Sequence, residues 1–241
     1  MNINDLEEKI RQSESMSLSA AFPILMRKVY LWMAMALAIS GLTAYSVAAS
    51  PGLVQLIYSS QLGIWAIIIA ELVLVWKISN SVAKENRSLA TTTLMFIIFS
   101  ALNGLTLSSI FVVFAPAAII KTFAVTAGTF GVMAAYGYFT SRDLTKIGGL
   151  LFMALIGVII ASVVNMFLHS SGLDLVVSII GVLVFVGLTA WDSQQIKMSL
   201  AMAPDLGETS QKLAVTGALS LYLDFVNLFL YLLRFFGGSR D

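Results

Sequence analysis

Three acidic residues stand inside long apolar stretches of this 241-residue chain and are the first candidates for chemistry. Glu71, Asp192 and Asp224 each interrupt a hydrophobic run, whereas the other ten of the 13 acidic residues lie in tails, loops or at the ends of such runs. A carboxylate at the centre of a membrane helix costs about 2.5–3.5 kcal/mol on insertion scales, so it is expected to face a partner group or a wet cavity. Acids in this setting favour proton or ion handling.

Asp224 lies on a polar stripe. Thr216, Ser220, Asp224 and Asn227 are spaced by four, four and three residues, which places them on one helix face. Asp224 follows Lys212 by 12 residues, so at a rise of 1.5 Å per residue it lies about 18 Å into a span, near the bilayer midplane. The stripe favours a role in ion or proton handling. The alternative is a hydrogen-bonded acid that only fixes helix packing.

Asp192 is placed to approach Asp224. It precedes Lys197 by five residues, and a loop of about 16 residues separates the two apolar runs, which predicts antiparallel neighbouring helices. Two carboxyl groups at hydrogen-bonding distance in a low dielectric tend to share one proton, because both cannot ionise cheaply. The protonated pair would tie the helices together, and the ionised pair would repel and attract cations. On its own, Asp192 could instead extend to the membrane interface.

The oxygen-bearing side chains also suggest cation binding. Calcium takes six to eight oxygen ligands from carboxylates, amides and carbonyls, and the candidate ligands are Glu71, Asp192, Asp224 and Asn227. A transient calcium site is predicted at Asp192 and Asp224, whereas Glu71 is either a third ligand or a local partner of a lysine such as Lys77. With one histidine, no cysteine and no EF-hand loop, we expect no resident cofactor.

The elements that position these acids are membrane helices. Hydrophobic residues make up 59% of the chain and charged residues 11%, and the net charge of +1 without a basic run excludes nucleic acid as the main partner. Runs of about 20 apolar residues predict membrane-spanning helices, and they are too long and too uniform for barrel strands. We predict an all-α membrane protein, a bundle of seven transmembrane helices in residues 28–241, with spans at about 29–49, 62–76, 89–114, 122–139, 148–168, 175–196 and 213–233.

Residues 1–27 form a polar N-terminal segment. Ile3, Leu6 and Ile10 are at helical spacing, which predicts a short amphipathic helix on the membrane surface; a disordered tail is the alternative. If the N-terminus is cytoplasmic, 11 Lys and Arg residues fall inside and three outside. The positive-inside rule therefore predicts a cytoplasmic N-terminus and an external C-terminus.

Two segments around the aspartates resemble a known family. Residues 221–230 (LYLDFVNLFL) and 233–237 (LRFFG) resemble the last-helix signature of the Bax inhibitor family, the transmembrane Bax-inhibitor-motif group, and residues 191–197 (WDSQQIK) resemble its sixth-helix motif. The resemblance implies a bacterial member in the inner membrane. It also implies a central seventh helix and a pH-sensitive calcium leak gated by two aspartates, here Asp192 and Asp224.

The resemblance further implies an acid in the second span, matched by Glu71, and a base that latches the sixth-helix acid. The nearest candidate latch bases are Lys77, Lys84 and Arg87. The basic tail of eukaryotic members is absent, so suppression of cell death is not carried over.

Two function classes follow. The first is a cation leak channel, permeable to calcium and embedded in the lipid bilayer, that opens when the aspartate pair loses its shared proton. The alternative is a regulatory partner of another membrane protein, such as a membrane-bound protease, with residues 1–26 as the contact segment. We predict no enzymatic activity, because Asp224 follows Leu221-Tyr222-Leu223 and lacks the Gly-x-Gly-Asp pattern of intramembrane aspartyl proteases.

Overall fold

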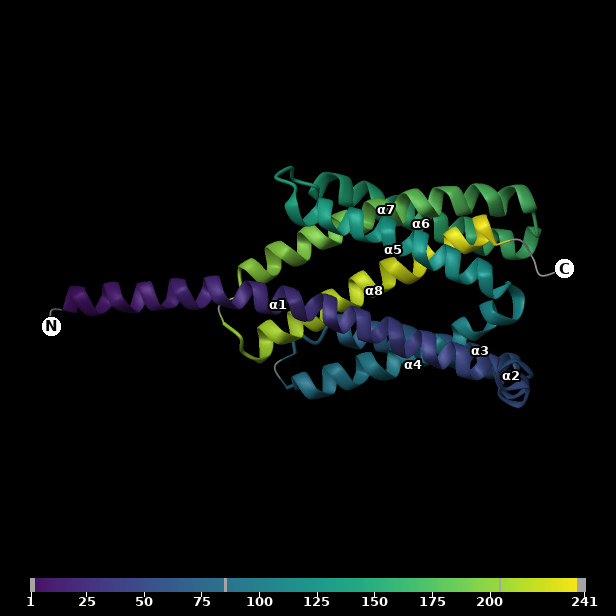
Figure 1. The fold of residues 1–241 in the computed structure, drawn as a ribbon, viewed down its shortest axis with the longest axis horizontal. Coiled ribbons are helices and arrows are strands. Elements are labelled where there is room, and N and C mark those ends of the chain that lie inside the picture. Colours follow the sequence, from purple (N-terminus) through teal and green to yellow (C-terminus); the bar gives the residue numbers. More distant parts are fainter. Residues whose placement is uncertain (1–2, 85, 204, 238–241) are drawn as a thin grey trace.

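The computed structural model describes residues 3–84, 86–203 and 205–237, with side chains from residue 21 onward. The described chain is a bundle of helices (Figure 1). In chain order the helices are α1 (Ile3–Ala48), α2 (Pro51–Tyr58), α3 (Gln61–Ser79), α4 (Leu89–Val113), α5 (Pro116–Phe139), α6 (Thr145–Leu168), α7 (Ser171–Ala201) and α8 (Glu208–Phe236).

Seven of these helices are long and apolar enough to cross a membrane, which confirms the predicted all-α, seven-span architecture. The additional short helix α2 starts with Pro51 at its first position, where the missing backbone N–H costs nothing. Tyr58 at its end reaches α4, with its hydroxyl 3.1 Å from the Leu105 carbonyl oxygen. The short helix therefore anchors the turn between the first two spans.

The seven spanning helices alternate in direction, so the N- and C-terminal ends of the described chain lie at opposite ends of the bundle (Figure 1). We call the end at which α1 enters the bundle the N-side; the α3–α4, α5–α6 and α7–α8 loops lie there. The opposite end, where α8 finishes, is the C-side.

Helix α8 is the centre of the bundle, as the family resemblance implied. In its most apolar stretch 67% of residues are buried, against 6% in α3 and 11% in α6, whose side chains face outward. It packs against α7, α1, α5 and α4. The fully buried side chains Tyr222, Leu221 and Leu228 lie on α8, so the neighbouring Asp224 is surrounded by protein instead of lipid.

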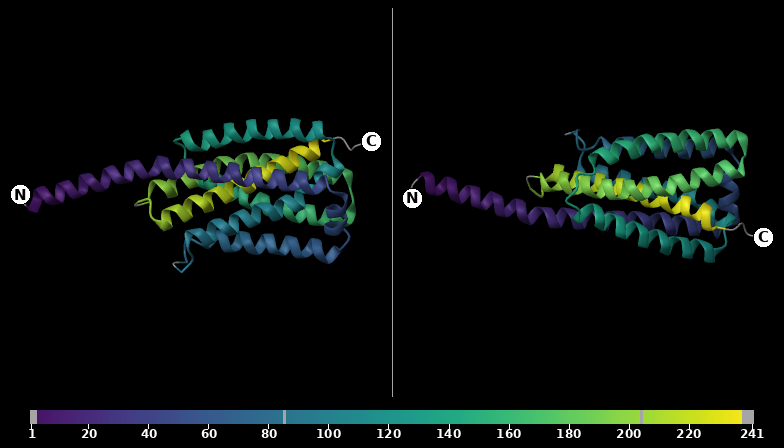
Figure 2. Two further views of the ribbon diagram at one scale, coloured as in Figure 1. Left: turned by 60° about the horizontal axis from the view of Figure 1, so that its bottom comes forward. Right: turned by 90° about the horizontal axis from the view of Figure 1, so that it is seen from above.

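Helix α1 continues past the bundle on the N-side as one unbroken ribbon (Figures 1 and 2). The backbone of this projection is helical from Ile3. The predicted amphipathic face is formed by Ile3, Leu6 and Ile10, and the structure describes side chains only from residue 21 onward. Its placement on a membrane surface stays a prediction.

Candidate functional site

The two aspartates singled out by the sequence meet in the structure. Asp192 on α7 and Asp224 on α8 form a side-chain hydrogen bond with each other. Asp224 is only 5% exposed, and its Oδ2 atom has no hydrogen-bond partner among the described residues. Two carboxyl groups can hydrogen-bond only if at least one of them carries a proton, so this contact requires a protonated carboxyl group.

A polar cleft reaches Asp192 from the N-side, between α7 and α8. Its volume is about 150 Å³, and its lining residues are Asp192, Gln195, Ile196, Ser199, Leu200, Leu213, Thr216, Gly217 and Ser220. A wider hollow of about 440 Å³ shares Ser199 and Leu213 with the cleft and also contacts the acidic side chains of Asp205 and Glu208. Asp192 therefore lines the cleft, and Asp224 lies behind it.

On the C-side of the pair, α8 is packed by aromatic rings. The Phe225 ring lies 5.4 Å from the rings of both Phe123 and Phe130 on α5, and the Phe229 ring lies 6.3 Å from Phe123. These contacts fill the space between α5 and α8 with apolar groups. The surroundings of the aspartate pair are thus asymmetric, polar toward the N-side and apolar toward the C-side.

The predicted stripe on α8 is divided by the structure. Thr216 and Ser220 line the same cleft as Asp192. Asn227 instead donates its amide Nδ2 to the Leu223 carbonyl of its own helix at 2.8 Å. Its assignment as a cation ligand stays a prediction.

Glu71 belongs to a different polar cluster. The Thr106 hydroxyl donates to Glu71 Oε1 at 2.7 Å, and Asn103 on the same helix α4 also hydrogen-bonds to this carboxyl group. Asn103 Oδ1 accepts the Tyr222 hydroxyl at 2.9 Å, and the Tyr222 oxygen lies 2.6 Å from the Ser40 hydroxyl. This chain of contacts joins α3, α4, α8 and α1 on a side of α8 away from Asp224.

The predicted calcium ligands are therefore distributed over two places. Among the described residues, no three acidic or histidine side chains come together as a group that could hold a metal ion. Asp192 and Asp224 supply two carboxyl groups at one location, and Glu71 makes its contacts with α4. Any cation at the pair would need further oxygens from Ser, Thr or backbone groups of the cleft, or from water.

Two of the three candidate latch bases, Arg87 and Lys84, make other side-chain contacts in this structure. Arg87 donates to the Lys77 carbonyl oxygen, and the Lys84 ammonium lies 5.7 Å from the centre of the Trp76 ring. Among the described residues, no ion pair links Asp192 to any of them. The hydrogen bond to Asp224 is the contact that holds Asp192.

One lysine close to a loop is buried in the fold. Lys212 on α8 is 3% exposed, and its Nζ donates to the carbonyl oxygens of Arg87 at 3.1 Å and Lys84 at 3.4 Å. Glu208, one turn earlier, accepts from the Leu89 backbone N–H at the start of α4. The start of α8 thus clamps the α3–α4 connection, and only the depth of burial distinguishes Lys212 from an ordinary loop lysine.

Replacing Lys212 with Met should loosen this connection. The apolar side chain keeps the length but leaves two carbonyl oxygens without their donor, at an expected cost of about 1–3 kcal/mol. We expect faster cleavage by trypsin after Lys84 and Arg87 in limited proteolysis of the detergent-solubilised protein. The control Lys146→Met removes an exposed lysine on the same side of the bundle, and cleavage equal to wild type in the Lys212 variant would contradict the clamp.

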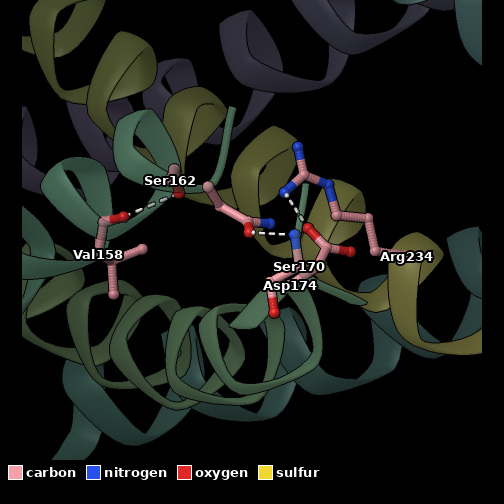
Figure 3. A network of polar contacts seen from close by, with 6 residues as sticks. Val158, Ser162, Ser170, Asp174 and Arg234 are labelled. Atoms are coloured by element: carbon pink, nitrogen blue, oxygen red, sulfur yellow. Dashed lines mark hydrogen bonds and ion pairs between the residues drawn. The ribbon is translucent and has the colours of Figure 1, made fainter. Parts of the chain in front are cut away.

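On the C-side, the ends of α7 and α8 are joined by the one ion pair among the described residues. Arg234 on α8 lies 3.6 Å from Asp174 in the first turn of α7, with both side chains about half exposed (Figure 3). The backbone N–H of Ser170 donates to the Asn165 side chain at 3.0 Å, which fixes the preceding turn (Figure 3). An exposed pair of this kind contributes little to stability, on the order of 0–1 kcal/mol.

Comparison with known proteins identifies the family. The family model described as "Inhibitor of apoptosis-promoting Bax1" matches residues 23–241, which includes helices α2 to α8, most of the first span and both aspartates. The chain belongs to the Bax inhibitor family. The predicted family is thereby confirmed, and the segments that carried the resemblance, residues 191–197 and 221–237, lie on α7 and at the end of α8.

Bacterial relatives match over most of the chain. The Inner membrane protein YbhL of Escherichia coli strain K12 is 48% identical over 217 residues, 89% of this chain and 92% of that protein. Proteins of Borreliella burgdorferi and Rickettsia prowazekii are 46% and 41% identical, over 89% and 90% of this chain and 91% and 90% of their own lengths. This Bax inhibitor family member is therefore an integral membrane protein, and its bacterial relatives match it over most of their own length.

Proposed function

We propose that this protein is a pH-sensitive cation leak channel, permeable to calcium, whose gate is the Asp192–Asp224 pair. The observation that carries the proposal is the hydrogen bond between two carboxyl groups, one of them 5% exposed, at the end of a polar cleft. The kinship with an inner membrane protein supports a location in the bacterial inner membrane. The excess of Lys and Arg on the N-side supports a cytoplasmic N-side.

The gating step is a proton loss. With one shared proton, the hydrogen bond holds α7 against α8, and the aromatic contacts of Phe225 and Phe229 with α5 stay in place. When that proton leaves, two like charges face each other in a low dielectric, and they repel. Separation of α7 and α8 would then disturb the aromatic packing on the C-side, and the exposed carboxylates would attract cations from the cleft.

The test is calcium flux into liposomes that contain the purified full-length protein and an internal calcium indicator. Since proton loss opens the gate, flux should rise as pH is raised on the side that the cleft faces, and a pH change on the other side should have a smaller effect. Protein-free liposomes give the background. Flux no greater than this background at every pH would overturn the proposal. The proposed function includes no catalytic step.

A second function is favoured by the projection of α1. The helix extends well beyond the bundle on the N-side (Figure 2), which makes residues 3–20 available to another protein. This supports a role as a regulatory partner of a membrane protein such as a membrane-bound protease. The two roles are compatible, because the projection and the aspartate pair lie on different parts of the molecule.

Deleting residues 1–20 separates the two roles. The truncated protein keeps the span that starts at Ala21, so we expect calcium flux equal to full length. Partners captured by chemical cross-linking in native membranes should be lost from the truncated protein. Continued co-purification of the same partner would contradict the contact role of the projection.

A further inference from the structure

A groove separates α1 from α5 on the N-side of the bundle. Helix α1 packs along α4 and α8, and α5 packs along α7 and α8, so the two helices flank α8. They touch near the N-side, where the Phe22 and Tyr138 rings stack with centres 6.3 Å apart. The hollow between them has a volume of about 560 Å³. It is lined by Pro23, Met26, Arg27, Tyr30, Phe130, Gly131, Ala134, Ala135, Tyr138 and Phe139.

The groove combines one cationic side chain with a mostly apolar lining. It contains Arg27, an exposed cation that makes no ion pair among the described residues, and the side chains of Tyr30 and Tyr138. A second cation lies behind Tyr138, because Lys197 Nζ donates to the Tyr138 carbonyl oxygen at 2.7 Å. The remaining lining residues are apolar, so the groove suits a molecule with an anionic head and an apolar body.

The groove runs from the membrane interface into the hydrocarbon. Phe139 is the last residue of α5, and Phe130 lies nine residues earlier, which is about 13 Å deeper at 1.5 Å per residue. Gly131 keeps this deeper part open: a Cβ at that position would meet no atom within 4 Å. Both flanking helices carry exposed apolar side chains, such as Leu31 on α1 and Val132 on α5, which face lipid in a membrane.

We propose that this groove binds an anionic phospholipid of the surrounding bilayer, with the phosphate on Arg27 and an acyl chain along Gly131 and Ala135 of α5. Arginine presents a planar set of donors that matches phosphate oxygens, and basic pockets between membrane helices on the cytoplasmic side bind anionic head groups. The volume is in the range of small-ligand sites.

The test of the head-group contact uses native mass spectrometry of the full-length protein with phosphatidylglycerol or phosphatidylcholine of identical acyl chains. Wild type should retain phosphatidylglycerol in preference to phosphatidylcholine. Arg27→Gln should weaken phosphatidylglycerol retention about tenfold, the size of one charged hydrogen bond. Lys146→Gln removes an exposed cation on the same side of the bundle outside the groove, and it should bind like wild type.

The acyl-chain contact is tested by a substitution that places a bulky side chain in the groove. Gly131→Phe should abolish retention of both lipids while Arg27 is intact, whereas Gly128→Phe, on the same helix and also facing open space, should not. An unchanged melting temperature in both variants confirms that they fold. Equal retention of the two lipids by wild type, undiminished retention in Arg27→Gln, or a cross-linked protein segment in the groove would each overturn the proposal.

Discussion

Asp192→Asn or Asp224→Asn should abolish the pH dependence of calcium flux in reconstituted liposomes. In the wild type, the closed state binds the shared proton and the open state has lost it, so rising pH favours opening. A step that releases one proton changes the ratio of the two states by up to about tenfold per pH unit. With either carboxyl group replaced by a neutral amide, no like-charge pair can form, and the slope of flux against pH should fall to near zero.

The two variants and their combination distinguish a gate from general damage. The amide retains hydrogen-bonding capacity and nearly the same shape, so the contact between α7 and α8 can persist. Because both acids act through one shared proton, Asp192→Asn combined with Asp224→Asn should add nothing to either single change. Asp174→Asn is the matched control, since Asp174 is half exposed at the C-side end of α7 and pairs with Arg234. Wild-type pH dependence in both single variants would refute the gate.

Replacing Gly137 with Ala should give the largest loss of stability from a single methyl group. Gly137 on α5 faces α7 so closely that a Cβ would lie 2.8 Å from the Ala190 carbonyl carbon and 2.9 Å from its Cα, and nearer still to the carbonyl oxygen. The obstacle is backbone, which cannot rotate away. Overpacking of this kind costs about 1–3 kcal/mol and sometimes more, which corresponds to a melting temperature lower by about 2–12 °C.

Gly131→Ala is the control for this prediction. It lies six residues earlier on α5, and a Cβ there meets no atom within 4 Å. Alanine has the higher helix propensity by about 1 kcal/mol, so this variant should melt at the wild-type temperature or slightly above it. Ala190 is two residues from Asp192, so Gly137→Ala should also alter calcium flux. Thermal unfolding in detergent checks the stability difference, and equal melting of the two variants would contradict the close contact.

The sequence by itself determined the number of spans, the acids within them and the family. Crossing a bilayer depends on local composition, because each segment must satisfy its own backbone and place about 20 apolar residues in the hydrocarbon. Glu71, Asp192 and Asp224 stand out for the same reason, since a charge in such a segment is costly wherever it lies. The segments around Asp192 and Asp224 were distinctive enough to predict the Bax inhibitor family, which the family match confirms.

The sequence predicted that Asp192 approaches Asp224, but only the tertiary structure decided where Glu71 makes its contacts. Asp192 and Asp224 form a pair, but Glu71 contacts Thr106 and Asn103, because α3 packs on α4. The burial of Lys212 under the α3–α4 connection likewise depends on where α8 begins relative to another loop. Helix order and rotation about the helix axes are set by close contacts between distant segments, such as Gly137 with Ala190. Hydropathy along the chain carries no record of those contacts, so the meeting of side chains had to come from the packed bundle.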